Sequence, residues 1–270
     1  MQMAGELVYE LLPLLRRFCI GPYSIALGGS HAKGTSDQLS DVDLYLFAPA
    51  VLPGTHRSEL VAAVLGSRVE AVSSWGIDEP FEQGGTDFQF RGRKVECWLR
   101  NSAQVAEQVA AAQRGRIRRE YSIWAVAGFF GHVILADVHS MHIIEDPQSV
   151  LTGWRATSAV YPEPLRHSLL KRFMREAAFW PDNFHYRSAV ARGDSLYTSG
   201  IAQQVVHALV QVVFALNRTY FPGDKKLSET LERLPSKPDA FTARVQALLF
   251  PESDPVPLCW RISAAHSVYW

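Results

Sequence analysis

Residues 28–47, GGSHAKGTSDQLSDVDLYLF, contain the pattern that decides the fold of the first half of the chain. A Gly-Gly-Ser turn precedes a short segment that can become helical, and an apolar strand then begins with Asp41 and Asp43. Residues i and i+2 of a strand face the same side, so both carboxylates are expected to point together. Two carboxylates at one point repel each other unless a cation lies between them. Magnesium carrying a triphosphate is the candidate, because one or two carboxylates plus substrate phosphates usually hold that ion.

The overall composition is that of a globular protein without a dominant charge. Of its 270 residues, 47% are hydrophobic and 20% are charged, and 27 Lys and Arg balance 27 Asp and Glu. Extended nucleic-acid-binding proteins usually carry a basic excess, so this balance argues against RNA or DNA as a partner. Three widely separated cysteines are typical of a reducing compartment. The sequence pattern shows no signal peptide and predicts no membrane span, so we expect a cytoplasmic protein.

The first part of the chain alternates between helix and strand signals, which predicts a small mixed sheet with helices. Pro13 is expected to kink or shorten the first helix, and Arg91-Gly92 is expected to form a hairpin turn. The predicted helices are residues 7–18 and 57–65, and the predicted strands are residues 23–27, 41–47, 69–72, 88–90 and 94–99.

The remainder of the chain has helical periodicity, with Ser102 as the expected N-cap of its first helix. The predicted helices are residues 103–112, 121–130, 165–180 and about 195–220, the last capped by Asp194 or Ser195. The pattern therefore predicts an α+β fold with two domains: a mixed-sheet domain at residues 1–110 and an all-α helical bundle at residues 111–270.

The motif in residues 28–47 resembles the signature of the DNA polymerase β-type nucleotidyltransferase superfamily. The resemblance is carried by Gly28-Gly29-Ser30 together with Ser40-Asp41-Val42-Asp43-Leu44. It implies that residues 1–110 are a nucleotidyltransferase domain that uses Mg²⁺ and ATP, or another NTP. Glycines let a backbone approach phosphate oxygens closely. The residues expected to contact the triphosphate are Gly29, Ser30, Lys33 and Ser40.

The superfamily usually has a third carboxylate on a neighbouring strand, and Glu96 is the best match. A glutamate flanked by apolar strand residues is costly to bury unless it is paired or ligates a cation. Asp87 is the alternative, although its glycine-rich setting predicts a loop. The resemblance therefore implies that Asp41, Asp43 and Glu96 are catalytic and bind the metal. The general base is either Glu96 or a carboxylate of the helical half.

A small nucleotidyltransferase domain followed by a helical domain resembles the bacterial aminoglycoside and lincosamide adenylyltransferases. The resemblance covers both halves but is specific only in the first. It implies a small-molecule hydroxyl acceptor, such as an antibiotic, and a basic residue supplied to the triphosphate by the helical domain. Lys225 is the first candidate for that residue, with Lys226 and Lys171 as alternatives, and an ordinary solvated lysine is the simpler interpretation of Lys225.

Two other functions stay open from the sequence. One is a nucleotidyltransferase that modifies a protein or an RNA, and the other is a catalytically silent nucleotide-binding or antitoxin-like module. Neutral charge argues against RNA, and three intact carboxylates argue against the silent module. The sequence does not predict the identity of the acceptor or the oligomeric state.

Overall fold

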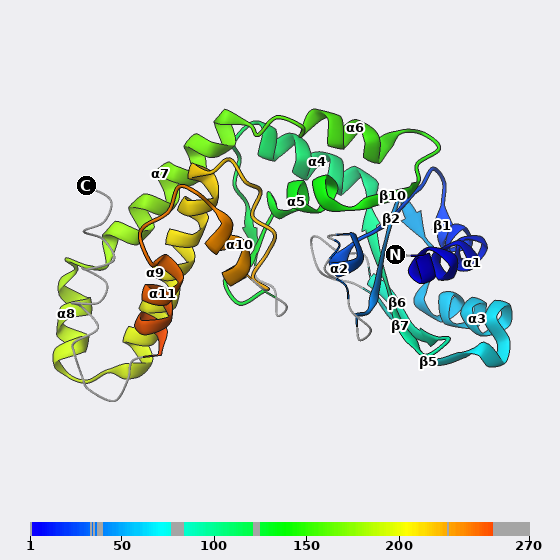
Figure 1. Ribbon diagram of the computed structural model, residues 1–270, viewed down its shortest axis with the longest axis horizontal. Helices are drawn as coiled ribbons and strands as arrows, with labels where there is room; N and C mark the ends of the chain where they lie inside the picture. The colour runs from blue at the N-terminus through cyan, green and yellow to red at the C-terminus, as the bar shows by residue number, and fades with distance from the viewer. Residues whose placement is uncertain are drawn as a thin grey trace. The chain divides into compact units, whose positions relative to one another are not determined.

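The computed structural model describes residues 2–32, 34, 36, 40–76, 84–120, 125–225 and 227–250. The chain divides into two compact units, each made from two separate stretches. The first unit comprises residues 1–111 and 134–160, and the second comprises residues 112–133 and 161–270. The fold class is α+β, as predicted, because a mixed sheet dominates the first unit and helices dominate the second (Figure 1).

The first unit contains most of the strands. Its helices are α1 (Gln2–Phe18), α2 (Gly29–Ala32), α3 (Gly54–Leu65), α4 (Ser102–Gln113), α5 (Val133–Ser140) and α6 (Val150–Thr157), with a 3₁₀ turn at Gly66–Arg68. Its strands are β1 (Cys19–Ile20), β2 (Ser24–Leu27), β3 (Val42–Ala48), β4 (Ala50–Val51), β5 (Val69–Gly76), β6 (Gly84–Phe90), β7 (Arg93–Asn101) and β10 (His142–Glu145).

Six of these strands form one mixed sheet in the order β10-β2-β3-β7-β6-β5. Only the β3–β7 pair is parallel, and the other neighbours are antiparallel. The β6–β7 hairpin turns at Arg91 and Gly92, both of which have positive φ angles of 53° and 72°. This geometry suits a two-residue hairpin turn, because its twist matches that of the strands.

The core lies on the face of the sheet that α1 and α3 cover. Val42, Leu44 and Leu46 of β3 are fully buried there, as are Val95 and Leu99 of β7. Each buried aliphatic side chain of this size stabilises the fold by about 1.5–3 kcal/mol relative to exposure. Because strand side chains alternate between faces, burying these residues forces Asp43 and Glu96 to the opposite face.

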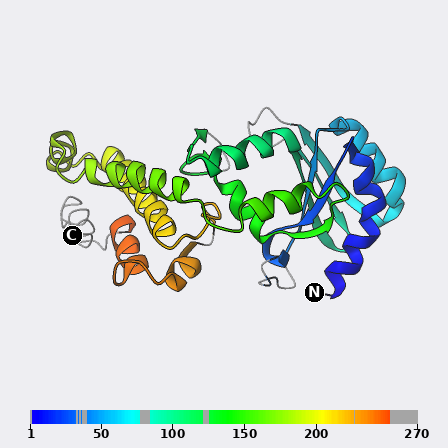
Figure 2. The same cartoon turned by 90° about the horizontal axis from the view of Figure 1, so that it is seen from above.

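The opposite face is covered at one end by helices that follow β7. Figure 2 shows α1 and α3 on one side of the sheet and the green helices α4 to α6 on the other. Phe47 of β3 packs edge-on against Trp154 of α6, with ring centroids 5.7 Å apart. Arg100 of β7 pairs with Asp137 of α5 at 3.5 Å. These contacts close the end of the face where β3 and β7 finish.

The second unit is built around a long central helix. Its elements are β8 (Arg119–Glu120), β9 (Phe129–Phe130), α7 (Glu163–Phe179), α8 (Phe184–Ala191), α9 (Ser195–Leu216), α10 (Leu227–Arg233) and α11 (Phe241–Leu249). The carboxylate of Asp194 accepts a hydrogen bond from the Tyr197 backbone N–H at 3.1 Å, so Asp194, and not the alternative Ser195, is the N-cap of α9.

Helix α9 is long enough and apolar enough to cross a membrane, judged by its length and composition alone. Its most apolar window has a mean hydropathy of 1.5, and 67% of that window is buried inside the protein. Contacts with α7, α8 and α11 account for this burial. The apolar character of α9 is therefore that of the central helix of a packed unit.

Several predicted elements differ from the structure. Residues 125–130, expected to be helical, form a turn and then β9, which pairs with β8; residues 121–124 lie outside the described part. Asn101, rather than Ser102, caps α4 by accepting from the Gln104 N–H at 3.0 Å. Helix α1 continues through Pro13.

The sequence prediction assigned residues 134–160 to the helical domain, whereas they belong to the first unit. The physical reason is strand pairing, since β10 adds to the edge of the sheet beside β2. Asp146, which follows β10, accepts a hydrogen bond from Ser24 Oγ at 2.6 Å and caps the start of α6. The first unit is therefore discontinuous in sequence.

Candidate active site

Three acidic residues lie in line across three neighbouring strands. Asp43 of β3 is the register partner of Glu96 of β7, and Glu96 is the partner of Asp87 of β6. All three are partly exposed, on the face opposite the core. Neighbouring strands are about 4.8 Å apart, so this register gathers the three carboxyl groups into one row. We call Asp43, Glu96 and Asp87 the carboxylate row.

Lys94 lies beside the carboxylate row, two residues before Glu96 on the same face of β7. Its Nζ donates a hydrogen bond to Glu96 Oε1 and lies 3.9 Å from Asp41 Oδ2. Asp41 directly precedes β3 and is in line with Lys94, because Val42 pairs with Val95. The hydrogen bond to Glu96, reinforced by the charge of Asp41, raises the pKa of Lys94. The ammonium therefore stays charged between the carboxylates of Asp41 and Glu96.

Asp87 is part of a strand, not of a loop as the sequence prediction had it. Burial raises the pKa of its carboxyl group, and the negative charge of Glu96 raises it further. The misleading signal was the glycine pair at residues 84–85. The informative signal in the sequence was the i, i+2 spacing of Thr86, Phe88 and Phe90. The structure buries all three side chains on one face of β6, which turns Asp87 to the other face.

The glycine turn lies directly against the carboxylate row. The Gly28 N–H donates to the Asp43 carbonyl oxygen at 2.8 Å. At Gly29, where φ is +58°, an added Cβ would lie 1.7 Å from Asp43 Oδ2. Only glycine permits this approach, both for its backbone conformation and for the space. The turn thus brings bare backbone to the Asp43 carboxylate.

The two predicted serines lie at the two ends of the segment between the turn and β3. Ser30 is in α2, a helix of four residues, and Ser40 is half-buried just before Asp41. His31 hydrogen-bonds to the backbone of Ser40, and burial lowers the pKa of its imidazole. This contact connects the turn to the strand that carries Asp43.

Neither of the two predicted basic residues, Lys33 and Lys225, is among the described residues of the first unit. Lys33 lies outside the described residues. Lys225 is exposed on the segment between α9 and α10 in the second unit. The expected contacts of Lys33 and Lys225 with a triphosphate stay predictions.

Aromatic side chains form the next row along the same face of the sheet. Tyr45 of β3 stacks on Trp98 of β7 with centroids 6.4 Å apart, and Trp75 of β5 meets Trp98 edge-on at 5.3 Å. Gly28 and Gly85 leave room for these rings, since an added Cβ at either would lie 2.4 Å from Tyr45 or Trp75 respectively. The sequence analysis did not identify this row, although i+2 spacing from Asp43 and Glu96 marks Tyr45 and Trp98.

The donor chemistry of the site fits a divalent cation, but the side chains are arranged around an ammonium group. Asp41, Asp43 and Glu96 supply the oxygen ligands that Mg²⁺ prefers. Among the residues that the structure describes, no group of three or more His, Cys, Asp and Glu is placed to hold a metal ion. Lys94 Nζ lies between Asp41 and Glu96 and forms an ion pair with each of them. The carboxylates thus have a positive partner, and that partner is part of the chain.

The second unit contains a polar chain that the sequence did not predict. His132 Nε2 lies 3.1 Å from Gln211 Oε1, Gln211 Nε2 lies 3.4 Å from His207 Nε2, and His207 Nδ1 lies 3.8 Å from Asp224 Oδ1. Burial lowers the pKa of His132 to about 4 and also lowers that of His207. Both imidazoles are therefore neutral at pH 7.

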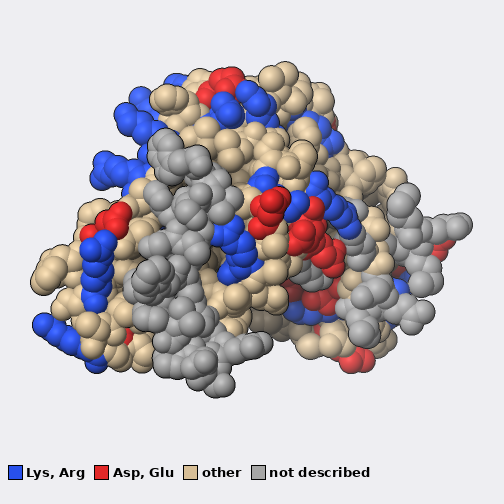
Figure 3. Space-filling model, turned by 60° about the vertical axis from the view of Figure 1, so that its left-hand side comes forward, with Lys and Arg blue, Asp and Glu red and all other residues tan. Residues whose placement is uncertain are grey.

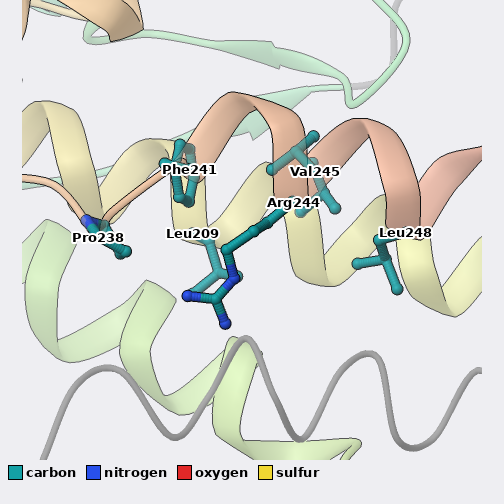
Figure 4. Close-up of a pocket in the computed structure, with 7 residues that line it drawn as sticks. Leu209, Pro238, Phe241, Arg244, Val245 and Leu248 are labelled. Carbon is teal, nitrogen blue, oxygen red and sulfur yellow. The ribbon is translucent and has the colours of Figure 1, made fainter.

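An apolar depression on the second unit is lined by few side chains that could act as acids, bases or nucleophiles. Figure 4 shows α9 and α11 contributing apolar side chains to it, with Arg244 as the charged group. Its lining residues are Val206, Leu209, Pro238, Phe241, Arg244, Val245 and Leu248. The carboxylate row of the first unit has the groups that chemistry on phosphate requires, and this depression does not.

Comparisons with known proteins give a partial match. Residues 132–227 match the model of a family described as a domain of unknown function (DUF4037). No curated protein matches the chain. A solved structure of a nucleotidyltransferase-like protein from Exiguobacterium sibiricum 255-15 is similar over 97% of this chain and 71% of that chain. Its sequence identity is 14% and the TM-score is 0.41, so the likeness is distant.

Proposed function

We propose that the protein is a Mg²⁺-dependent nucleotidyltransferase. It transfers a nucleoside monophosphate, with ATP as the first candidate donor, to a hydroxyl group of a small molecule such as an aminoglycoside-type antibiotic. The observation that carries the proposal is the carboxylate row placed against a turn where Gly29 has no side chain. A metal-bound triphosphate needs anionic oxygens for the metal and approachable backbone for the phosphates.

Each residue of the site has a defined role in this proposal. Asp41 and Asp43 hold the metal, and Glu96 contributes to a second metal position or acts as a base. Bound Mg²⁺ supplies charge neutralisation on the phosphates and on the leaving pyrophosphate. Ser30 and Ser40 have hydroxyl groups that can donate hydrogen bonds to phosphate oxygens.

The proposed reaction is an in-line displacement at the α-phosphorus. The acceptor hydroxyl oxygen forms a bond to that phosphorus, and the bond between the phosphorus and the bridging oxygen of pyrophosphate breaks. Pyrophosphate leaves with the electron pair of that bond. The hydroxyl proton passes to a carboxylate, for which Glu96 is the candidate.

Charge favours a small acceptor over a nucleic acid. Lys and Arg equal Asp and Glu in number. On the face drawn in Figure 3, basic side chains are scattered and several lie beside acidic ones. Nucleic-acid affinity depends on a continuous basic surface that neutralises successive phosphates.

A mass-spectrometric screen tests the proposal. Each of the four NTPs is incubated with the protein, Mg²⁺ and a panel of hydroxyl-bearing antibiotics and metabolites, and the acceptor is examined for a gain of one nucleoside monophosphate. Asp43→Asn should abolish the gain while leaving the melting temperature nearly unchanged. Asp182→Asn, at an exposed aspartate of the second unit, is the matched control and should retain wild-type transfer.

The same screen separates the other functions. A mass gain on a protein or an RNA instead of a small molecule would redirect the acceptor class. Absence of Mg²⁺-dependent NTP binding in calorimetry would rule out the transferase. Wild-type transfer by Asp43→Asn would rule out the assigned metal site.

A further inference from the structure

We propose that Lys94 is the built-in counter-cation of the carboxylate row and that a divalent cation must displace its ammonium group from Glu96 and Asp41 before a nucleotide can bind productively. This inference rests on the proposed function for its metal step. It adds a positioning residue that acts through the carboxylates rather than on the substrate.

The register of the sheet supports the role of Lys94 as a counter-cation. Lys94 lies in line with Asp41 on the neighbouring parallel strand and is two residues before Glu96 on its own strand. Its Nζ contacts oxygens of both residues, with Asp41 Oδ2 at 3.9 Å. Strand alternation therefore directs Lys94 and the acidic side chains to one place, and no rearrangement of the backbone is needed to form the contact.

The balance of charge also supports the role of Lys94 as a counter-cation. Asp87 and Glu96 are direct register partners, and like charges in that position destabilise a sheet. The negative charge of Glu96 contributes to the raised pKa of Asp87, and the positive charge of Lys94 acts in the opposite direction. Without a cation, four carboxyl groups would repel one another at this edge of the face. Lys94 offsets that repulsion when no metal is bound.

The mobility expected of a lysine supports the displacement step. Lys94 has 47% of its side chain exposed, whereas Glu96 has only 18%. A lysine ammonium is a point charge on a flexible four-carbon stem, so it can leave its position without moving the strand. A metal ion at Glu96 Oε1 would bring a second positive charge next to the ammonium group that already donates to this oxygen, and the two charges repel each other. The two cations therefore compete for the same oxygen.

Direct metal titration tests the competition. Mn²⁺ binding, followed by the loss of the free-ion electron paramagnetic resonance signal, is measured for wild-type protein and for Lys94→Met, Lys94→Arg and Arg93→Met. Lys94→Met should bind Mn²⁺ at least about tenfold more tightly, because a competing charge about 4 Å away is removed. Lys94→Arg retains a cation and should stay near the wild-type affinity. Arg93→Met removes a charge from the adjacent residue and should also match wild type.

A second measurement is made without any metal. The melting temperatures of Lys94→Met, Glu96→Gln and the double variant are compared in EDTA at low salt. Loss of Lys94 should lower the melting temperature in the wild-type background and much less in the Glu96→Gln background, because the repulsion it offsets is then smaller. Equal losses in both backgrounds would contradict the counter-cation role.

The outcomes distinguish this inference from the proposed function. Unchanged or weaker Mn²⁺ binding by Lys94→Met would overturn the inference and leave the transferase proposal standing. Tighter binding by Lys94→Met in a protein that transfers no nucleotide would support the inference and count against the transferase. Absence of Mn²⁺ binding by every variant, with or without NTP, would overturn both.

Discussion

Gly29 and the carboxylate of Asp43 lie closer together than any other residue at position 29 would permit. An added Cβ would overlap Asp43 Oδ2, and the backbone there has a φ of +58°. A side chain at position 29 would therefore have two unfavourable effects. It would strain the backbone, and it would displace the Asp43 carboxylate. The second effect is specific to the site, whereas the first is general.

Two alanine substitutions separate these effects. Gly29→Ala should reduce nucleotide transfer by about 100-fold, the loss typical of a displacement of about 1 Å at a reacting group. Gly34→Ala is the matched control, since Gly34 also has a positive φ of 68° but has no atom within 4 Å of an added Cβ. Both variants should lose about 1–2 kcal/mol of stability through backbone strain, and Gly29→Ala should lose more because its Cβ also meets the Asp43 carboxylate. Steady-state transfer and urea denaturation measure the two quantities. Equal transfer by both variants would contradict the assigned role of the Gly29 contact.

The positions of the acidic residues follow from alternation, but their grouping does not. The period of two in residues 42–47 and 95–99 predicts the faces of Asp43 and Glu96. The parallel register between β3 and β7 then makes them neighbours, and it depends on the chain crossover through residues 49–92, which no local pattern determines. Asp87 joins them only because β6 pairs with β7 in one particular register.

At the scale of elements, a buried arginine joins α3 to the strands beside the aromatic row. The Arg57 side chain donates to Thr86 Oγ1 at 2.8 Å, and to the carbonyl oxygens of Leu52, Trp75 and Gly85 at 2.6–3.0 Å. Arg57 is 2% exposed, and burial lowers the pKa of its guanidinium. The four acceptors of this cation are uncharged oxygens from separate segments, so the geometry of this corner depends on one side chain.

Replacing Arg57 should destabilise the protein strongly. Arg57→Met leaves several buried carbonyl oxygens without donors, at about 1–3 kcal/mol each, so we expect a loss of about 3 kcal/mol or more in the free energy of unfolding. Arg68→Met is the control, because Arg68 is 51% exposed and pairs with Glu10 at the surface. Its loss should be below about 1 kcal/mol. Urea denaturation compares the two, and a similar loss in both would show that the Arg57 network contributes little.

At the scale of the whole molecule, each compact unit combines segments that are distant in the sequence. β10 joins the first unit after the chain has already contributed β8 and β9 to the second. The second unit also encloses His132, which is 2% exposed and reaches Gln211 of the central helix. An imidazole enclosed in this way makes stability depend on pH.

Acidification should destabilise the protein between about pH 6.5 and pH 4. Burial lowers the pKa of His132 from 6.5 to about 4, so in this range the unfolded chain binds a proton that the folded chain does not. Stability is full above pH 6.5 and falls as the pH decreases, by up to about 3 kcal/mol from this group. His207 acts in the same direction, because burial also lowers its pKa.

Chemical denaturation at a series of pH values measures this dependence. His132→Gln should reduce the loss of stability between pH 7 and pH 5, whatever its effect at pH 7. His185→Gln, at an exposed histidine, should keep the wild-type dependence. Identical pH dependence in wild type and His132→Gln would contradict the assignment to His132.

The sequence by itself determined the α+β class, most of the helices and strands, the start of the long helix at Asp194 or Ser195, and the faces on which Asp43 and Glu96 lie. These features depend on local periodicity and on turn chemistry, both of which are written in contiguous residues. The tertiary structure alone decided that Asp87 and Lys94 join the row, that Tyr45, Trp98 and Trp75 lie beside it, and that β10 completes the sheet. Those features depend on strand order and register, which are set by packing between segments far apart in the chain.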